Sequence, residues 1–300
     1  TSVAQSGTGL ADVNLTAGQL ATTGAVYDYA QPTYAGATLA FGNVRTGATV
    51  AAQGITVHNL VVTDAAYQEA LAVSAASANG KLSLAGLSGL VAGDTAGTVE
   101  VAAVTTSAGS LAATLSLGFT STGKVAGSAI GGLTSSALSG GTVTVTGAAY
   151  DLANASLNST VAFGGVRVGA TSNLAVTNTV ITAAAFQDDL GVTATAGTTQ
   201  LTLANPALIA AGATRNVVVT AAKAGLLTDT LTLSLASKAL TASGLADGAT
   251  TSQTVAVTGT AYDFASATHA ATLALGNVRV TTNATTGTLT VTNALATNGT

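Results

Sequence analysis

The residues of this chain that could do chemistry recur together: each of three Tyr-Asp pairs is followed 16 or 17 residues later by an arginine. The nine residues are Tyr27, Asp28, Arg45, Tyr150, Asp151, Arg167, Tyr262, Asp263 and Arg279. An aspartate and an arginine can form an ion pair or bond the backbone, and a tyrosine ring packs while its hydroxyl stays polar. We expect the tyrosine to pack at a junction between domains, with Asp and Arg pairing or bonding the backbone across it. The alternative is a tyrosine that caps a core beside a solvated aspartate, where a surface ion pair contributes at most about 1 kcal/mol.

Other residues that could act in catalysis or metal binding lack partners in the sequence. His58 and His269 occupy unrelated positions of their repeats, so neither offers a base with an orienting partner. Asp188 and Asp189 are neighbours on one segment, and no Asp-x-Asp-x-Asp run supplies clustered oxygen ligands for calcium. The glycine-rich stretch 126–132 lacks the Lys-Ser/Thr and the helix of a phosphate-binding loop. We therefore expect no enzyme activity, no cofactor and no metal.

The composition limits the classes of protein to consider. Of the 300 residues 48% are hydrophobic and only 7% are charged, with a net charge of −4. So little charge gives weak repulsion between molecules, which is typical of a chain that is anchored, assembled or glycosylated outside the cell. The eight Lys and Arg are scattered, so no nucleic-acid partner is expected. No uncharged apolar run approaches the roughly 20 residues that cross a membrane, so we expect no direct membrane insertion. The N-glycosylation pattern occurs at Asn14, Asn158, Asn283 and Asn298.

The spacing of the Tyr-Asp pairs indicates a repeat of domain size. The pair recurs after 123 residues and again after 112, well above the roughly 20–50 residues of a solenoid repeat. We expect one repeat at 29–150 and a second at 151–262. Residues 1–28 are expected to supply the last strand or strands of a preceding or partner-completed repeat, and 263–300 the first strands of a further, incomplete one.

Within each repeat the pattern predicts strands. Thr142–Thr146 and Thr254–Thr258 alternate small polar with β-branched apolar residues, the period of a strand with one face in a core. Only 63–71 and 182–190 could form a helical turn, the first with a Thr-Asp start that resembles an N-cap. About seven strands are expected in the first repeat, near 38–41, 50–58, 70–75, 81–85, 97–104, 111–118 and 141–147. Seven short strands predict an all-β fold of tandem immunoglobulin-like β-sandwich domains.

The two ends of the chain each match one part of a repeat. Gly9-Leu10-Ala11-Asp12 parallels Gly244-Leu245-Ala246-Asp247, and a strand expected near 15–26 parallels 251–259. Residues 264–300 match only the first strands. Two readings stay open. The chain can be a window on a longer array, with neighbouring repeats as partners. Alternatively, the C-terminal strands of one subunit and the N-terminal strand of the next complete a shared sheet, giving head-to-tail self-association.

The element Phe41-Gly42-Asn43-Val44-Arg45-Thr46-Gly47, with its alternating strand ending in His58-Asn59, resembles the choice-of-anchor D family. The second copy keeps the pattern, and the third departs from it, with Leu275 in place of Phe and Asn283 near the expected closing Gly. The resemblance implies immunoglobulin-like sandwich repeats of bacterial surface and secreted proteins, and therefore an extracellular or cell-surface location.

These observations predict a structural role in an extracellular bacterial surface assembly, as a filament subunit or a repeat stalk. The alternative is an adhesin-type binding module, in which loops at one end of a sandwich hold a glycan or a protein. The loops are nearly free of aromatic residues, which weakens sugar stacking as a binding mechanism.

Overall fold

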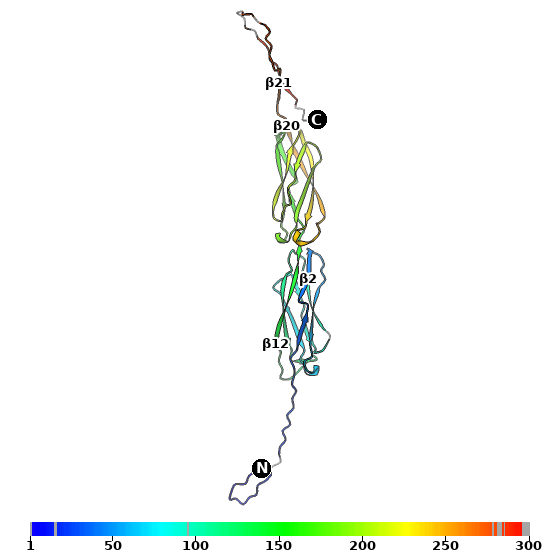
Figure 1. Cartoon of the computed structure of the whole chain (residues 1–300), viewed down its shortest axis with the longest axis vertical. Helices are drawn as coiled ribbons and strands as arrows, with labels where there is room; N and C mark the ends of the chain where they lie inside the picture. The colour runs from blue at the N-terminus through cyan, green and yellow to red at the C-terminus, as the bar shows by residue number, and fades with distance from the viewer. Residues whose placement is uncertain are drawn as a thin grey trace.

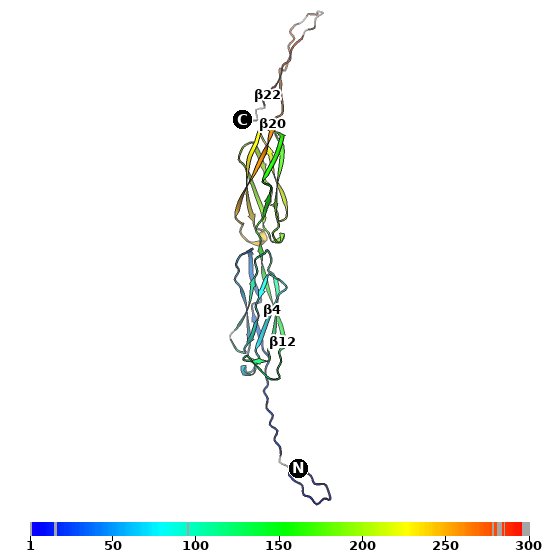
Figure 2. The same ribbon diagram turned by 180° about the vertical axis from the view of Figure 1, so that it is seen from behind.

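The computed structural model describes residues 2–14, 17–94, 96–277, 279–280, 284 and 286–295. Three single turns of 3-10 helix are the helical elements among these residues, and the other elements are strands. Two β-sandwiches lie end to end along one long axis, with the terminal segments at opposite ends of the rod (Figure 1). The view from behind shows the same arrangement (Figure 2). The predicted fold class, all-β with tandem immunoglobulin-like sandwiches, is confirmed.

The first sandwich packs two sheets around one apolar core. One sheet has the order β1 (Pro32–Ala35), β3 (Gln53–Asn59), β7 (Gly97–Ala103), β5 (Leu82–Leu84). The other has the order β2 (Thr38–Arg45), β12 (Ser136–Tyr150), β9 (Ala113–Ser121), β4 (Leu71–Ala76), β6 (Leu87–Leu90), and β8 (Gly109–Ser110) also pairs with β12. A small hairpin joins β10 (Lys124–Val125) to β11 (Ser128–Ala129). Burial alternates along β9, so Leu115, Leu117 and Phe119 point into the core.

The second sandwich repeats this plan with fewer strands. One sheet has the order β13 (Ala155–Leu157), β15 (Thr171–Asn178), β18 (Thr214–Ala221), β17 (Leu201–Ala204). The other has the order β14 (Thr160–Arg167), β20 (Thr250–Tyr262), β19 (Gly225–Lys238), β16 (Asp189–Ala196). Its core is a separate cluster that includes Leu174, Ile209, Leu231 and Leu233.

In each sandwich the last strand pairs in parallel with one of the first. β12 runs parallel to β2, and β20 runs parallel to β14, whereas every other named strand pair of the described residues is antiparallel. The chain therefore enters a sandwich at one end and leaves it at the other, which produces a rod. A bulge interrupts each parallel ladder. In the first sandwich Gly147 approaches Gly42 at the bulge, and a Cβ added to Gly147 would lie 2.5 Å from the Gly42 carbonyl oxygen. Only glycine fits there.

The predicted strands of the first repeat correspond to β2, β3, β4, β5, β7, β9 and β12, and the short strands β1, β6, β8, β10 and β11 were not predicted. The expected helical turns are the 3-10 turns η1 (Ala65–Tyr67) and η2 (Ala184–Phe186), and the Asp64 carboxylate accepts from the Ala66 amide at 2.9 Å as an N-cap. A third turn, η3, spans Thr241–Ser243. None of these described helices is long and apolar enough to cross a membrane.

The terminal segments differ from the sandwiches. The strand predicted near 15–26 is not formed in its described part, 17–26, because those residues are exposed and no described strand pairs with them. Near the other end, β21 (Ser266–His269) pairs with β22 (Val291–Ala294) as an isolated two-stranded hairpin.

Candidate functional site

The site with the most built contacts is the junction where the chain passes from the first sandwich to the second. β12 ends at Tyr150, whose buried ring packs on Phe186 of η2 with centroids 5.5 Å apart and planes tilted by 54°. The Asp151 amide donates to the Phe186 carbonyl at 2.8 Å, and the Asp188 amide donates to the Asp151 carbonyl at 3.0 Å. The connecting residue is therefore already bonded into the second sandwich, and no free linker separates the two.

An ion pair crosses this junction. Arg45 is the last residue of β2 and lies beside Tyr150 in the parallel register. Its Nη1 is 2.8 Å from Oδ2 of Asp188, whose side chain is 0% exposed, whereas that of Arg45 is 25% exposed. The Arg45 Nη2 donates to the Ala246 carbonyl at 2.6 Å, and the Ser237 hydroxyl donates to the same Asp188 carboxylate at 2.8 Å. A buried carboxylate needs a counter-charge and donors, and here the neighbouring domain supplies the charge.

Two further side chains of the first sandwich bond across the junction. The Thr46 hydroxyl donates to Oδ1 of Asp151 at 2.6 Å, and the Asn43 amide donates to the Ser243 carbonyl at 2.9 Å. The end of β2 thus contacts the connecting residue, the segment after η2 and the η3 loop. Contacts to three separate segments restrict both bending and twisting between the sandwiches.

A buried amide network supports the receiving surface. The Asn178 side chain donates to the Asp188 and Ile209 carbonyls at 2.9 and 3.0 Å, and it accepts from the Asn154 amide and from Gln187. All four bonding positions of this amide are used. The first sandwich repeats the network with Asn59 and Gln68 in the same roles.

The N-terminal Tyr-Asp pair has the same geometry as the central one. The Tyr27 ring packs on Tyr67 at 5.7 Å, the Asp28 amide donates to the Tyr67 carbonyl, and the Glu69 amide donates to the Asp28 carbonyl. Glu69 stands where Asp188 stands in the second sandwich. Its buried carboxylate accepts from the Ser121 hydroxyl at 2.6 Å and from the Gly123 amide at 2.8 Å.

The third set lies at the far end of the second sandwich and is open. Tyr262 is exposed, and the Arg167 guanidinium donates to the Asp263 carbonyl at 2.7 Å and lies 5.3 Å from the Phe264 ring centre. Arg279 is exposed in the C-terminal segment. Of the nine residues predicted for junctions, the structure brings Arg45, Tyr150 and Asp151 together between two sandwiches.

Several residues of the junction were missed by reasoning from sequence. In the sequence Asp188 and Asp189 are adjacent carboxylates that indicate no binding site, yet in the structure Asp188 forms the ion pair with Arg45. A signal was present: an Asn and a Gln nine residues apart occur in both copies, as Asn59 with Gln68 and Asn178 with Gln187. Polar residues that keep their spacing between repeats while their neighbours change indicate a shared buried role.

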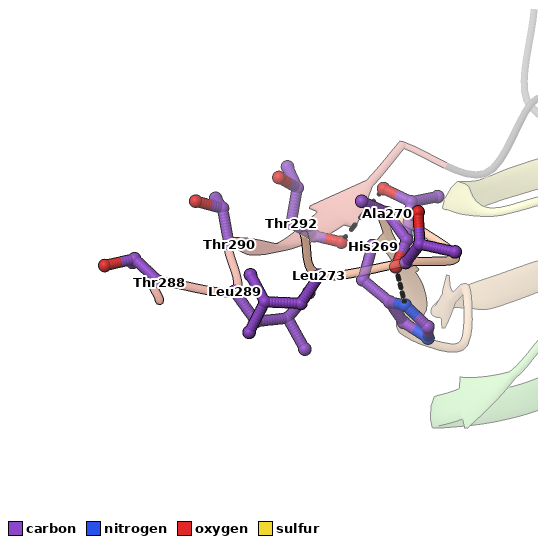
Figure 3. Close-up of a pocket in the computed structure, with 9 residues that line it drawn as sticks. His269, Ala270, Leu273, Thr288, Leu289, Thr290 and Thr292 are labelled. Carbon is purple, nitrogen blue, oxygen red and sulfur yellow. Dashed lines mark hydrogen bonds between the residues drawn. The ribbon is translucent and has the colours of Figure 1, made fainter. Parts of the chain in front are cut away.

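The other depressions of the described surface are shallow and hold no cluster of charged side chains. One lies on the C-terminal hairpin, where Leu273 and Leu289 lie beside a row of threonines (Figure 3). The Nδ1 atom of His269 lies 2.9 Å from the carbonyl oxygen of its neighbour Ala270. In the part of the chain that the structure describes, no three His, Cys, Asp or Glu side chains gather as metal ligands. The sequons at Asn14 and Asn158 are exposed, and those at Asn283 and Asn298 lie outside the described residues.

No family model and no curated protein matches the chain, so the resemblance to choice-of-anchor D repeats stays a prediction. Among solved structures, the chain is similar to the D00-D0 domain of intimin, with 13% identity, a TM-score of 0.32 and coverage of 76% of this chain and 99% of that one. It is similar to the enterotoxigenic E. coli adhesin CfaE at 8% identity, with a TM-score of 0.33 and coverage of 79% and 89%. A third likeness is to domains 1–6 of the surface layer protein SbsC, at 13% identity, a TM-score of 0.29 and coverage of 82% and 30%.

Proposed function

We propose that this chain is a structural rod segment of an extracellular bacterial surface assembly, either a repeat stalk or a filament subunit. The observation that supports this role is the junction between the sandwiches. Tyr150 and Asp151 are consecutive residues, one packed on and the other bonded to the second sandwich, and Arg45 contributes an ion pair beside them. A rod that holds its ends apart or transmits force needs rigid junctions between its domains.

The surface chemistry fits the same role. The outward-facing positions of strands such as β9 and β20 carry Thr, Ser and Gln. Such a surface is wet but nearly uncharged, so it neither attracts nucleic acid nor repels a neighbouring copy strongly. Stacked sandwiches supply length, and the polar, neutral strands present few side chains that trypsin-like proteases cut.

The test compares interdomain flexibility in matched variants. In Tyr150→Ala/Arg45→Ala the ring contact and the ion pair are lost, so the distribution of interatomic distances from small-angle X-ray scattering should lose its long-distance component as the rod bends. The control, Tyr262→Ala/Arg167→Ala, changes the same residue types at the open end and should leave that distribution unchanged. Unchanged scattering from the first variant would argue against a stiff rod. Saturable binding of a glycan or a protein by the intact chain would favour the adhesin alternative.

A further inference from the structure

The N-terminal segment already has the backbone of the end of a sandwich. Residues 1–28 align with 236–263 without a gap, at a constant offset of 235 positions. Three hydrogen bonds are common to both segments at that offset. The Ala4 amide donates to Asp12 Oδ1, as the Ala239 amide donates to Asp247 Oδ1. The Val13 amide donates to the Ser2 carbonyl and the Thr8 hydroxyl to the Gln5 carbonyl, as Gly248 donates to Ser237 and Ser243 to Leu240. Residues 15–27 therefore correspond to β20, the last strand.

The C-terminal hairpin has the backbone of the beginning of a sandwich. β21 and β22 pair with Ala267 opposite Asn293, as β13 and β15 pair with Ala155 opposite Asn178. The Ser266 amide donates to the Asn293 side chain at 2.9 Å, which is the bond that the Asn154 amide makes to Asn178. In sequence, 272–279 matches β14 at an offset of 112 positions, and all of these residues except Val278 are described.

Both segments expose residues whose counterparts are buried. Leu20 is 90% and Val26 is 91% exposed, whereas Val255 and Ala261, at the same positions of β20, lie in the second core. Leu273 and Leu289 are each 47% exposed, and their counterparts are the core residues Val161 and Leu174. Figure 3 shows these two leucines side by side on the hairpin. Apolar side chains of this size are stabilised by burial, at about 25 cal/mol per Å².

A glycine pair points to how the two segments fit. Gly276 has φ +69°, matching +71° at Gly42 and +64° at Gly164, so the bulge of the early strand is already formed. At Gly24 a Cβ would meet no atom within 4 Å. At the equivalent Gly259 it would lie 2.8 Å from the Gly164 carbonyl oxygen. Position 24 thus carries the glycine that a parallel partner with a bulge requires.

We propose that the N-terminal strand of one copy of this chain pairs in parallel with the segment 272–279 of a second copy, in the register of β20 and β14. That register places Ala21 opposite Thr272, Gly24 opposite Gly276, Ala25 opposite Asn277 and Tyr27 opposite Arg279. The pairing is between copies, because the two segments lie at opposite ends of the rod (Figure 1). The inference rests on the proposed role as a rod and names the partner at its ends.

The register also completes a second junction. With Arg279 beside Tyr27, its guanidinium takes the position that Arg45 has beside Tyr150. Glu69 of the copy that supplies Tyr27 then receives Arg279, as Asp188 receives Arg45. The two segments together supply the equivalents of β13, β14, β15 and β20, so the shared unit has open edges, and we expect association to be reversible and to depend on concentration.

The absence of cysteine from the sequence allows a clean crosslinking test on the full chain. Equal amounts of Ala25→Cys and Asn277→Cys are mixed and oxidised, and the mixed disulfide is measured by mass spectrometry. Opposite residues in a sheet lie within the roughly 4.4–6.8 Å between Cα atoms that a disulfide spans. The control, Ala21→Cys with Asn277→Cys, is about 13 Å out of register and should lose the mixed dimer. Equal crosslinking of both pairs, or none of either, would overturn the proposal.

A second variant tests the fit without a covalent bond. Gly24→Ala should leave the monomer unchanged but abolish the concentration-dependent species in sedimentation velocity. Gly18→Ala is the control, because its counterpart Gln253 already carries a side chain, and it should associate like the unmodified chain. If Gly24→Ala associates normally, the register is wrong. If the rod is stiff but the chain does not associate, this inference is wrong and the proposed function stands. If the junction between the sandwiches is flexible, the proposed function itself is wrong.

Discussion

Arg45 and Asp188 form an ion pair across the junction, with Nη1 and Oδ2 2.8 Å apart. Arg45 ends β2 of the first sandwich, and Asp188 directly precedes β16 of the second. The carboxylate is fully buried, so its charge depends on a group that its own domain does not supply. The pair therefore links the two sandwiches, and we expect it to couple their folding as well as their orientation.

Replacing Arg45 should lower the stability of the second sandwich more than that of the first. Arg45→Ala leaves a buried carboxylate without its counter-charge, which costs about 3–5 kcal/mol for a fully buried pair. Because Arg45 is 25% exposed and partly screened by water, we expect a loss of about 2 kcal/mol, below the range for a fully buried pair. Urea unfolding, monitored by hydrogen exchange of the amides of each sandwich, measures the stability of the two sandwiches separately.

Two comparisons check that the ion pair is the cause. Arg167→Ala removes the corresponding arginine of the second sandwich, which forms no ion pair among the described residues, and should shift the urea midpoint little. In a double-mutant cycle, Asp188→Asn should offset part of the loss caused by Arg45→Ala, because it removes the orphaned charge. Strictly additive losses would mean that the two side chains do not interact.

The buried amide of Asn178 should matter more than any surface asparagine. Asn178→Ala leaves the Gln187 side chain, the Asn154 amide and two carbonyls without their partner, and we expect the second sandwich to lose about 2–4 kcal/mol. Asn173→Ala, on the exposed face of the same strand, is the control and should change stability by less than about 0.5 kcal/mol. Thermal unfolding by calorimetry measures both. A loss for Asn178→Ala as small as that of the control would show that the network is dispensable.

The glycine bulge should tolerate no side chain. Gly147→Ala places a Cβ 2.5 Å from the Gly42 carbonyl oxygen, at a residue with φ +137°. Steric repulsion and backbone strain together should cost about 2–4 kcal/mol in the first sandwich. Gly80→Ala, where a Cβ would meet no atom within 4 Å, should leave the unfolding midpoint in place. A stable Gly147→Ala protein would mean that β2 and β12 can separate at the bulge without loss.

The η3 loop should loosen in acid. The Lys238 ammonium bonded to Asp247 lowers the pKa of that carboxyl below its ordinary value of 3.8, and the Ala239 amide adds to the effect. A lowered pKa in the folded state means that the interaction stabilises the protein above pH 3.8 and is lost as the pH falls through the folded-state pKa. Carboxyl NMR should give a midpoint for Asp247 below 3.8, and Lys238→Gln should raise it. A midpoint at the ordinary value would show that the bond is absent in solution.

The strands and the repeat could be read from sequence because both depend on local spacing. Alternation of Thr with Val or Leu places one face of β9, β12 or β20 in a core whatever strand lies beside it. Pairing is not local: nothing in Thr160–Arg167 alone indicates that it runs parallel to β20, and residues 17–26 have the composition of a strand but no neighbour to pair with. Asp188 escaped notice for a similar reason, since its partner belongs to another domain. The repeated Asn–Gln spacing indicates that the segment around Gln187 is buried, but it does not indicate which residue of another domain pairs with Asp188.

The parallel pairing of β14 with β20 has a mechanical consequence. Tension on the two ends of the second sandwich pulls β14 one way, through β13 that precedes it, and the end of β20 the other way. These adjacent strands are then loaded in shear, with the bonds between their seven paired positions lying across the line of pull. Such bonds must rupture together, whereas a hairpin pulled from its open end unzips one bond at a time. The same holds for β2 and β12, so an appendage built from these units would resist drag along its axis far better than its modest cores suggest.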